Sequence, residues 1–264
     1  MTRNGWILGW SALVAASLSA RAASAEAFAT DWAQASKSEA RLVAAGAALA
    51  GFEIRLAPGA ITYWRDPGDA GVPPTFDFTG SENVGRVDPV FPAPRRIKER
   101  DGSEAFGYDA PVVIPLKVEP LDPAKPVTLA LVVNYAVCEK LCLPARASLK
   151  LTLFDAVSPY AADIEAALAA APRPVEAAVA GKLEHAGANA WRLCAAHEAG
   201  PARDVFVEPP EGWWVTAEAA PSEAGRDCFV LTLRNKPGDA ALPVPLRLTL
   251  TGGDGPKETT VIAR

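Results

Sequence analysis

The chain has 264 residues, half of them hydrophobic, and its 26 basic and 31 acidic side chains give a net charge of −5. An acidic chain is a poor partner for nucleic acid, because a phosphate backbone attracts a basic face. The length suits two domains of about 100 to 130 residues each, and the hydrophobic content is enough for each to bury a core.

Residues 1–25 are typical of a secretory signal peptide. Arg3 precedes an apolar run over residues 6–18, small residues follow, and cleavage fits after Ala22 or, as we favour, after Ala25. The alternative is an uncleaved membrane anchor, although this run is shorter than the roughly 20 residues that a spanning helix needs. We therefore expect an exported, periplasmic protein that is soluble after signal cleavage.

The segment after the signal peptide mixes one ambiguous stretch with clear β signals. Residues 26–51 are alanine-rich, and a weak amphipathic helix and a strand both fit them. From Phe52 onward, alternating apolar residues followed by Pro58 and Gly59 predict a β-hairpin. Residues 66–111 are rich in Pro, Gly and Asp, which favours turns and loops and excludes long helices.

Three further strands are predicted over residues 112–118, 127–137 and 145–154. The middle strand is almost continuously apolar over residues 127–133, which predicts burial on both of its faces. Residues 156–174 place apolar residues at helical intervals and end in prolines, so we expect a short helical linker there.

The pattern after the linker is again that of short strands separated by turns. We therefore expect a first β domain over residues 26–155, the helical linker over residues 156–174, and a second β domain over residues 175–264. The predicted fold class is all-β, with two antiparallel β-sandwich domains.

Cys138 and Cys142 are the strongest candidates for chemistry. A tight turn between two strands can bring cysteines at this spacing into bonding distance, whereas a regular helix does not readily do so. A disulfide that closes so small a loop adds little stability, at the low end of roughly 0 to 5 kcal/mol. Reversible thiol exchange explains the pair better, and Lys140 and Arg146 are near enough in sequence to favour a thiolate. A structural clip and a Cu(I) site remain as alternatives.

The other candidate residues lie in the second β domain. Cys194 and Cys228 are each on a predicted strand, and we expect a structural disulfide, with two unpaired core thiols as the alternative. His185 and His197 are expected to be exposed residues in turns or at strand ends. The sequence contains no hydrolase motif or phosphate-binding loop, and we assign neither a metal nor a cofactor.

The string VTLALVVNYAVCEKLCLPARASLKLTL resembles the N-terminal periplasmic domain of the thiol:disulfide interchange protein DsbD and of the related ScsB proteins. The upstream strings ITYWRDPGDAGVPPTFDFTGSENV, FPAPRRI and FGYDAPVVIPLKV occur in the order that this family shows, so the likeness covers about residues 45–155. It implies an immunoglobulin-like domain that accepts electrons from a membrane-embedded thiol reductase and reduces periplasmic disulfide or thioredoxin-like proteins. The second β domain fits the two-domain ScsB-like arrangement, which extends the expectation to two immunoglobulin-like sandwiches.

The resemblance also implies roles for individual residues. Cys142 matches the exposed, attacking cysteine of the family and Cys138 the resolving one. The family's cap loop over the pair matches about residues 98–108, where Phe106 or Tyr108 would be the covering aromatic side chain.

Two departures from the family pattern bear on this assignment. Three residues separate the cysteines, where the best-known DsbD has more, so the local geometry and the redox potential can differ. The chain also contains no membrane electron-transfer domain and no C-x-x-C motif. We expect a free-standing thiol:disulfide interchange component that acts as a protein-disulfide reductase. A copper(I) carrier or a redox-inert binding module is the alternative.

Overall fold

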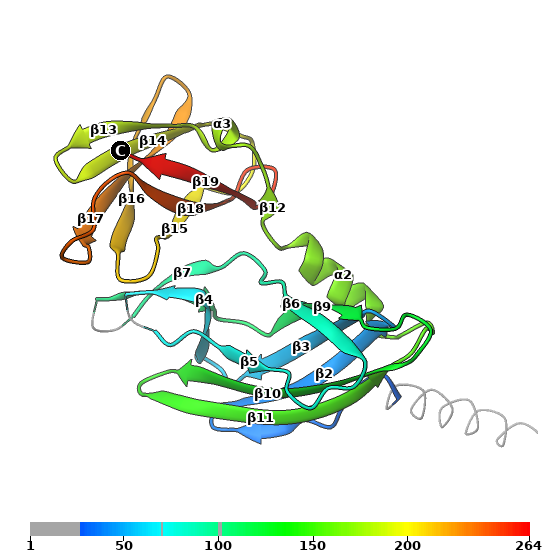
Figure 1. Ribbon diagram of the computed structural model, residues 1–264. Coiled ribbons are helices and arrows are strands. Elements are labelled where there is room, and N and C mark those ends of the chain that lie inside the picture. The colour runs from blue at the N-terminus through cyan, green and yellow to red at the C-terminus, as the bar shows by residue number, and fades with distance from the viewer. Residues whose placement is uncertain (1–26, 70, 100–101) are drawn as a thin grey trace, which may run out of the picture. The chain divides into compact units, whose positions relative to one another are not determined.

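The computed structural model describes residues 27–69, 71–99 and 102–264 (Figure 1). The signal peptide predicted over residues 1–25 lies outside these ranges. Within them, no helix is both long and apolar enough to cross a bilayer. The described residues form two compact units, the first ending at Val90 and resuming over Pro94–Leu168, the second comprising Phe91–Ala93 and Ala169–Arg264.

The first unit consists of two antiparallel sheets. In order across the sheet, one contains β1 (Ala33–Ala35), β2 (Ser38–Gly46), β3 (Leu49–Leu56), β9 (Val112–Pro120) and β6 (Val84–Pro89). The other contains, in the same sense, β11 (Cys142–Leu153), β10 (Val127–Cys138), β4 (Ile61–Gly68), β8 (Glu104–Tyr108) and β7 (Arg95–Lys98), and β5 (Thr75–Asp77) pairs with β10. The predicted all-β class is confirmed.

Contacts between β2, β3 and β10 join the two sheets into a sandwich. The rings of Phe52 and Tyr135 meet edge to face, with centroids 6.0 Å apart. The hydroxyls of Ser38 and Tyr135 lie 3.0 Å apart in a buried hydrogen bond. Because a buried polar group is costly without a partner, this pair satisfies two hydroxyls inside an otherwise apolar core.

The ambiguous stretch over residues 26–51 is largely strand. In β2, Ala40, Leu42 and Ala44 are fully buried, while Glu39 and Arg41 on the other face are more exposed; Val43 is the exception and is buried. That period of two is the mark of a strand with one face on the core. The Pro- and Gly-rich stretch over residues 66–111 likewise contains the four short strands β5 to β8.

The prediction that the middle strand is buried on both faces was wrong. In β10, Leu129, Leu131 and Val133 are buried, whereas Ala130 and Val132 are only half-buried. A sheet in a two-layer sandwich turns one face to the core and the other outward, and small or β-branched apolar residues are tolerated on the outer face.

The hairpin predicted around Pro58 and Gly59 was also wrong. The turn is there, with Gly59 at a φ of 77°, but β3 and β4 belong to different sheets and do not pair. The turn therefore carries the chain from one layer of the sandwich to the other. Alternating apolar residues on both sides of a turn fit either connection, because in both cases each strand turns one face to the same core.

Helix α2 (Ala161–Ala169) packs on the first unit. Ile164 is fully buried, and a Cβ placed on Gly51 of β3 would lie 3.1 Å from its Cγ1 atom. The hydroxyl of Ser158 donates a hydrogen bond to the carbonyl oxygen of Ala44. The segment predicted as a linker is thus held to a sheet of the first unit as far as Leu168.

The second unit is a smaller sandwich. Its core is formed by alternating residues from both of its sheets, among them Trp191, Phe229 and Leu248. The short helix α3 (Ala177–Ala180) contributes Ala180 to this core. One sheet contains β12 (Arg173–Pro174), β19 (Lys257–Ala263), β18 (Val244–Thr251) and β15 (Asp204–Glu208), and the other contains β13 (Lys182–Gly187), β14 (Ala190–Ala196), β17 (Arg226–Asn235) and β16 (Trp214–Glu223). Pairing is antiparallel except between β12 and β19.

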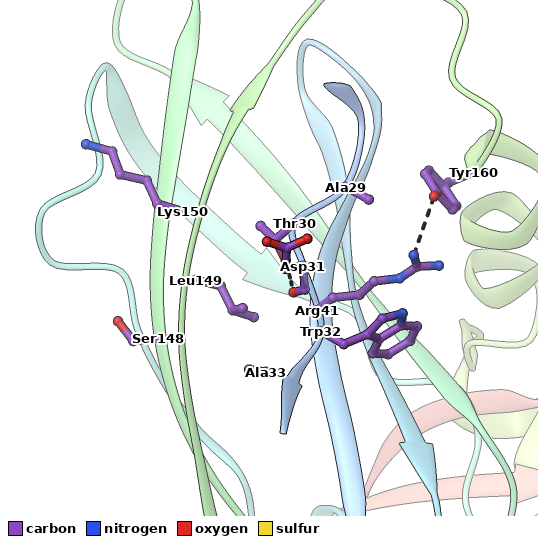
Figure 2. A pocket seen from close by; sticks show the side chains of 10 residues that line it. All are labelled: Ala29, Thr30, Asp31, Trp32, Ala33, Arg41, Ser148, Leu149, Lys150 and Tyr160. Carbon is purple, nitrogen blue, oxygen red and sulfur yellow. Dashed lines mark hydrogen bonds between the residues drawn. The ribbon is translucent and has the colours of Figure 1, made fainter. Parts of the chain in front are cut away.

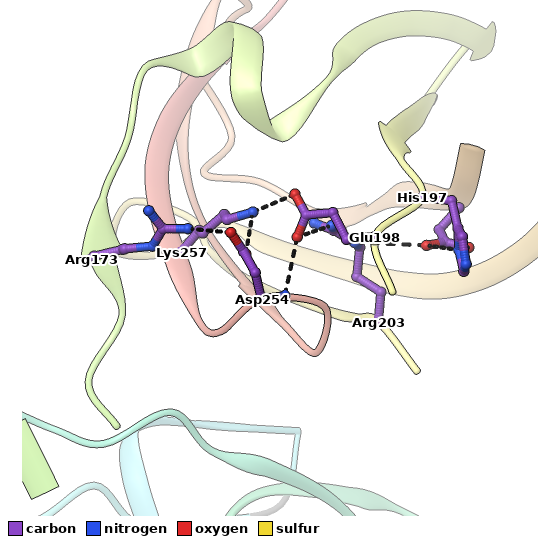
Figure 3. Close-up of polar contacts among 7 residues, drawn as sticks. Arg173, His197, Glu198, Arg203, Asp254 and Lys257 are labelled. Carbon is purple, nitrogen blue, oxygen red and sulfur yellow. Dashed lines mark hydrogen bonds and ion pairs between the residues drawn. The ribbon is translucent and has the colours of Figure 1, made fainter. Parts of the chain in front are cut away.

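A network of charged side chains stabilises one end of the second unit (Figure 3). The side chains of Lys257 and Arg203 are almost completely buried, and both pair with Glu198. Asp254 pairs with Lys257 and with Arg173 of β12. Hydrogen bonding from Lys257 is the main reason that the pKa of Asp254 is lowered to about 2. The network places carboxylates against two buried cations and ties β12 to the sheet.

Gly107 of β8 gives a test of how tightly β8 lies against β4. A Cβ at this position would lie 2.1 Å from the carbonyl oxygen of Thr62. We expect Gly107→Ala to separate the two strands, to lower the free energy of unfolding by about 1 to 3 kcal/mol, and to speed amide hydrogen exchange in β4. Gly46→Ala is the matched control, because nothing lies within 4 Å of a Cβ there. Equal exchange rates in both variants would contradict the close packing.

Candidate functional site

The closed end of the β10–β11 hairpin carries the cysteine pair. Cys138 is the last residue of β10, Cys142 is the first residue of β11, and the register of the hairpin places them directly opposite each other. Their Cα atoms are 4.1 Å apart and their sulfurs form a disulfide. The pairing of the two strands thus sets the distance between the sulfurs.

The two cysteines differ in exposure. Cys138 is only 3% exposed, whereas Cys142 is exposed, and the neighbouring Leu141 is 70% exposed. A thiolate on another protein therefore has access to Cys142 and not to Cys138. This asymmetry suits one attacking and one resolving cysteine.

Tyr63 of β4 is in direct contact with the disulfide. Its hydroxyl lies 2.7 Å from Cys138 Sγ and 3.3 Å from Cys142 Sγ. The same hydroxyl donates to Glu99 Oε1 at 3.3 Å. Sulfurs in a disulfide carry no proton and the phenol has only one, so at any moment the hydroxyl donates to Glu99 or to one of the sulfurs. Sequence reasoning did not select Tyr63 or Glu99 as site residues.

Burial and charge both keep the Tyr63 hydroxyl protonated. Tyr63 is 2% exposed and packs in a small apolar cluster with Ala105, Ala136 and Cys138. The pKa of Tyr63 is raised to about 12, first by burial and second by the negative charge of Glu99. At neutral pH the side chain is therefore a fixed hydrogen-bond donor beside the sulfurs.

Of the predicted cap loop, Lys98 belongs to β7 and residues 104–108 form β8, and these two strands pair as a hairpin. Phe106 packs its ring beneath the Arg96 guanidinium, 5.0 Å from the ring centroid, and Tyr108 is buried opposite Thr62. Ala105 of β8 belongs to the same apolar cluster as Cys138, and Glu99 accepts a hydrogen bond from the Tyr63 hydroxyl. That Phe106 or Tyr108 covers the pair stays a prediction.

Cys194 of β14 and Cys228 of β17 also form a disulfide, between directly opposed residues of adjacent strands. Cys228 is 2% exposed, but both cysteines alternate with core residues such as Leu193 and Phe229, so the bond lies on the outer face of its sheet. The Glu223 carboxylate lies within 4.8 Å of both sulfurs. The bonded sulfurs are not thiolates, so this group does not offer a metal site in its oxidised form.

Both histidines lie in the second unit. The ring of His185 is 6.4 Å from that of Trp191, and His197 pairs with Asp227 at 3.1 Å. Each is an exposed residue, on β13 or just after β14.

Two hollows open on the first unit. One, of about 620 Å³, is lined by Cys142 and by apolar residues of β10 and β11. The other, of about 760 Å³, surrounds Arg41 (Figure 2). There the Arg41 guanidinium lies 4.2 Å from the Trp32 ring and 4.8 Å from the Tyr160 ring, and it pairs with Glu53 at 2.7 Å. Those contacts satisfy Arg41, and no cysteine lines this second hollow.

Comparison with known proteins points to thiol:disulfide chemistry. Residues 29–153 match the family model described as "Thiol:disulfide interchange protein DsbD, N-terminal". The N-terminal periplasmic domain of ScsB from Proteus mirabilis has the same fold, with a TM-score of 0.71 and 21% sequence identity over 89% of this chain and 97% of that one. No curated protein sequence matches the chain.

Replacing Glu99 tests the link between the cap hairpin and Tyr63. We expect Glu99→Gln to lower the pKa of Tyr63 from about 12, because it removes a negative charge that opposes ionisation, but to leave it above 10.0, because burial is the larger cause. The pKa can be followed by NMR of proteins labelled with ¹³C at the tyrosine Cζ atom. Glu104→Gln is the control, since that carboxylate pairs with Arg96. An unchanged Tyr63 pKa in Glu99→Gln would show that Glu99 does not act on the phenol.

Proposed function

We propose that this protein exchanges disulfides with other proteins through Cys138 and Cys142, in keeping with the match of residues 29–153 to the model of DsbD N-terminal domains. The observation that carries the proposal is the asymmetry of the pair, with Cys142 exposed and Cys138 buried against Tyr63. A purely structural bond needs no such difference, and a bond that closes so short a loop stabilises the fold little.

In the reductive direction, the Cys142 thiolate attacks one sulfur of a partner disulfide. A mixed disulfide forms, and the other partner sulfur leaves as a thiolate that takes up a proton. The Cys138 thiolate then attacks Cys142 Sγ and releases the first partner sulfur as a second thiolate, which is protonated in turn. The partner disulfide gains two electrons and two protons, and Cys138 and Cys142 become a disulfide.

Tyr63 has a positioning role in this sequence. Its hydroxyl is within 3.3 Å of both sulfurs and is held protonated, so it can donate a hydrogen bond to whichever sulfur carries negative charge. Hydrogen bonding to a charged form stabilises it and lowers the pKa of that group. Glu99 orients the phenol and opposes its ionisation.

The family suggests where the electrons come from and go to. A membrane-embedded thiol reductase would supply electrons, and periplasmic disulfide or thioredoxin-like proteins would receive them. Residues 1–25 would direct export to the periplasm and be removed. Residues 26–155 would form the exchanging domain, residues 156–174 its helical linker, and residues 175–264 a second domain that assists partner recognition.

Single cysteine variants test the proposed roles. We expect Cys138→Ser to accumulate mixed disulfides between Cys142 and periplasmic proteins, because the resolving thiol is missing, and Cys142→Ser to accumulate few. Adducts are counted on non-reducing gels and lost on reduction. The control is the double variant Cys194→Ser and Cys228→Ser, which should exchange as the parent does.

The opposite pattern, with most adducts in Cys142→Ser, would reverse the assigned roles. Absence of adducts from every variant, together with copper bound to the purified parent, would contradict exchange. That outcome would favour a copper(I) carrier.

A further inference from the structure

A groove beside the exposed cysteine is lined by residues from the end of β10 and the start of β11. It has a volume of about 620 Å³, and Cys142 is among its lining residues. Its lining is mostly apolar and comprises Val72, Pro73, Thr75, Asn134, Tyr135, Ala136, Cys142, Leu143, Pro144, Ala145 and Arg146. The attacking sulfur and this groove therefore belong to one continuous surface.

The groove follows the spacing of a strand. Cys142, Pro144 and Arg146 are the exposed, alternating residues at the start of β11, so their side chains share one face. An extended segment lying along that face presents its own side chains at the same interval. The distance from Cys142 to Arg146 is four residues, or about 13 Å.

The chemistry changes along the groove. Of the lining residues, Pro73, Ala136 and Pro144 are apolar, and Val72 is 59% exposed although it is a large hydrophobic residue. At the far end, Arg146 is the charged residue among those that line the groove. The Arg146 side chain is exposed, so its guanidinium is accessible to a carboxylate of a bound chain.

A mixed disulfide constrains where a partner chain can lie. Bonded cysteines have Cα atoms about 4.4 to 6.8 Å apart, so the residues next to a partner's cysteine must contact the surface around Cys142. An extended chain leaving that cysteine along β11 enters the groove within two residues.

Resting on the proposed function, we propose that this groove selects disulfide partners by an extended segment in which an apolar side chain stands two residues from the reactive cysteine and a carboxylate four residues from it. The apolar side chain packs on Val72 and Pro144. The carboxylate pairs with Arg146.

Peptide disulfides test this selection. The probe is the peptide Glu-Ala-Leu-Ala-Cys-Ala-Leu-Ala-Glu as a mixed disulfide with glutathione, whose symmetric sequence fits either chain direction. Two matched peptides replace both leucines by serine or both glutamates by glutamine. The measured quantity is the ratio of second-order rate constants for reaction with the reduced full-length protein, which cancels the intrinsic reactivity of the thiolate.

We expect the leucine peptide to react at least about fivefold faster than the serine peptide, since a partly buried leucine is favoured over serine. The glutamate peptide should react about two- to threefold faster than the glutamine peptide, as an exposed ion pair is worth little. Val72→Asp should bring the leucine-to-serine ratio of rate constants close to one. Arg146→Gln should bring the glutamate-to-glutamine ratio close to one. Val157→Asp is the matched control, because Val157 is 96% exposed and lies outside the groove.

The failures of the two proposals are distinguishable. If the reduced protein reacts with all three peptides at equal rates, the groove does not select partners and the exchange function stands. If Val157→Asp lowers the leucine-to-serine ratio as much as Val72→Asp does, the effect belongs to charge in general and the groove is again rejected. If the protein reacts with no peptide and with no small aromatic disulfide, the exchange function fails and the groove proposal with it.

Discussion

The pairing of β10 with β11 is the constraint on which the site depends. The pairing runs without a register shift from the pair Val127–Leu153 to the pair Cys138–Cys142. The core-facing residues of both strands fix this register. A slip of one residue would turn every side chain of one strand to the opposite face. The buried leucines of these strands therefore also determine that the sulfurs meet and that Cys142 faces outward. The pairing of these two strands therefore both stabilises the sandwich and sets the geometry of the disulfide.

The neighbouring strand adds the polar part of the site. β4 pairs with β10 at Ile61 and Thr62, and this places the next residue, Tyr63, against the sulfurs. Glu99 comes from the β7–β8 hairpin and reaches the same hydroxyl. The buried Tyr63 hydroxyl needs a hydrogen-bond acceptor both when the Cys138–Cys142 disulfide is formed and when it is reduced. The Glu99 carboxylate and the cysteine sulfurs supply such acceptors in both states.

The sequence predicted most elements whose pattern is local. The strands around Cys138 and Cys142 follow from their apolar residues and from the tight turn between them, and the disulfide follows from that turn. Whether Pro58 and Gly59 close a hairpin or cross between sheets depends on pairings with distant strands, which no local pattern contains. The same limit applies to residues 26–51, where helix and strand both fit the sequence and the pairing of β2 with β3 decides for a strand.

The polar contacts of the site could not be predicted from the sequence, for a related reason. Tyr63 and Glu99 are 36 residues apart, and each lies far along the chain from the cysteines. Only the order of strands in the sheet brings them together. Tyr63 did stand in a segment with a family resemblance, which was the one signal that pointed to it. Glu99 and the groove residue Val72 come from turn-rich sequence, where composition predicts loops but not the surfaces that they contact.

The reduction potential of the Cys138–Cys142 disulfide tests the central claim most directly. It can be measured by alkylation and mass spectrometry across glutathione buffers, with the Cys194–Cys228 disulfide followed separately in the same samples. Reversible exchange predicts a potential between about −120 and −270 mV for Cys138–Cys142, the range of proteins that exchange disulfides. A value below about −300 mV, typical of structural disulfides, would contradict the account and make the pair a structural clip.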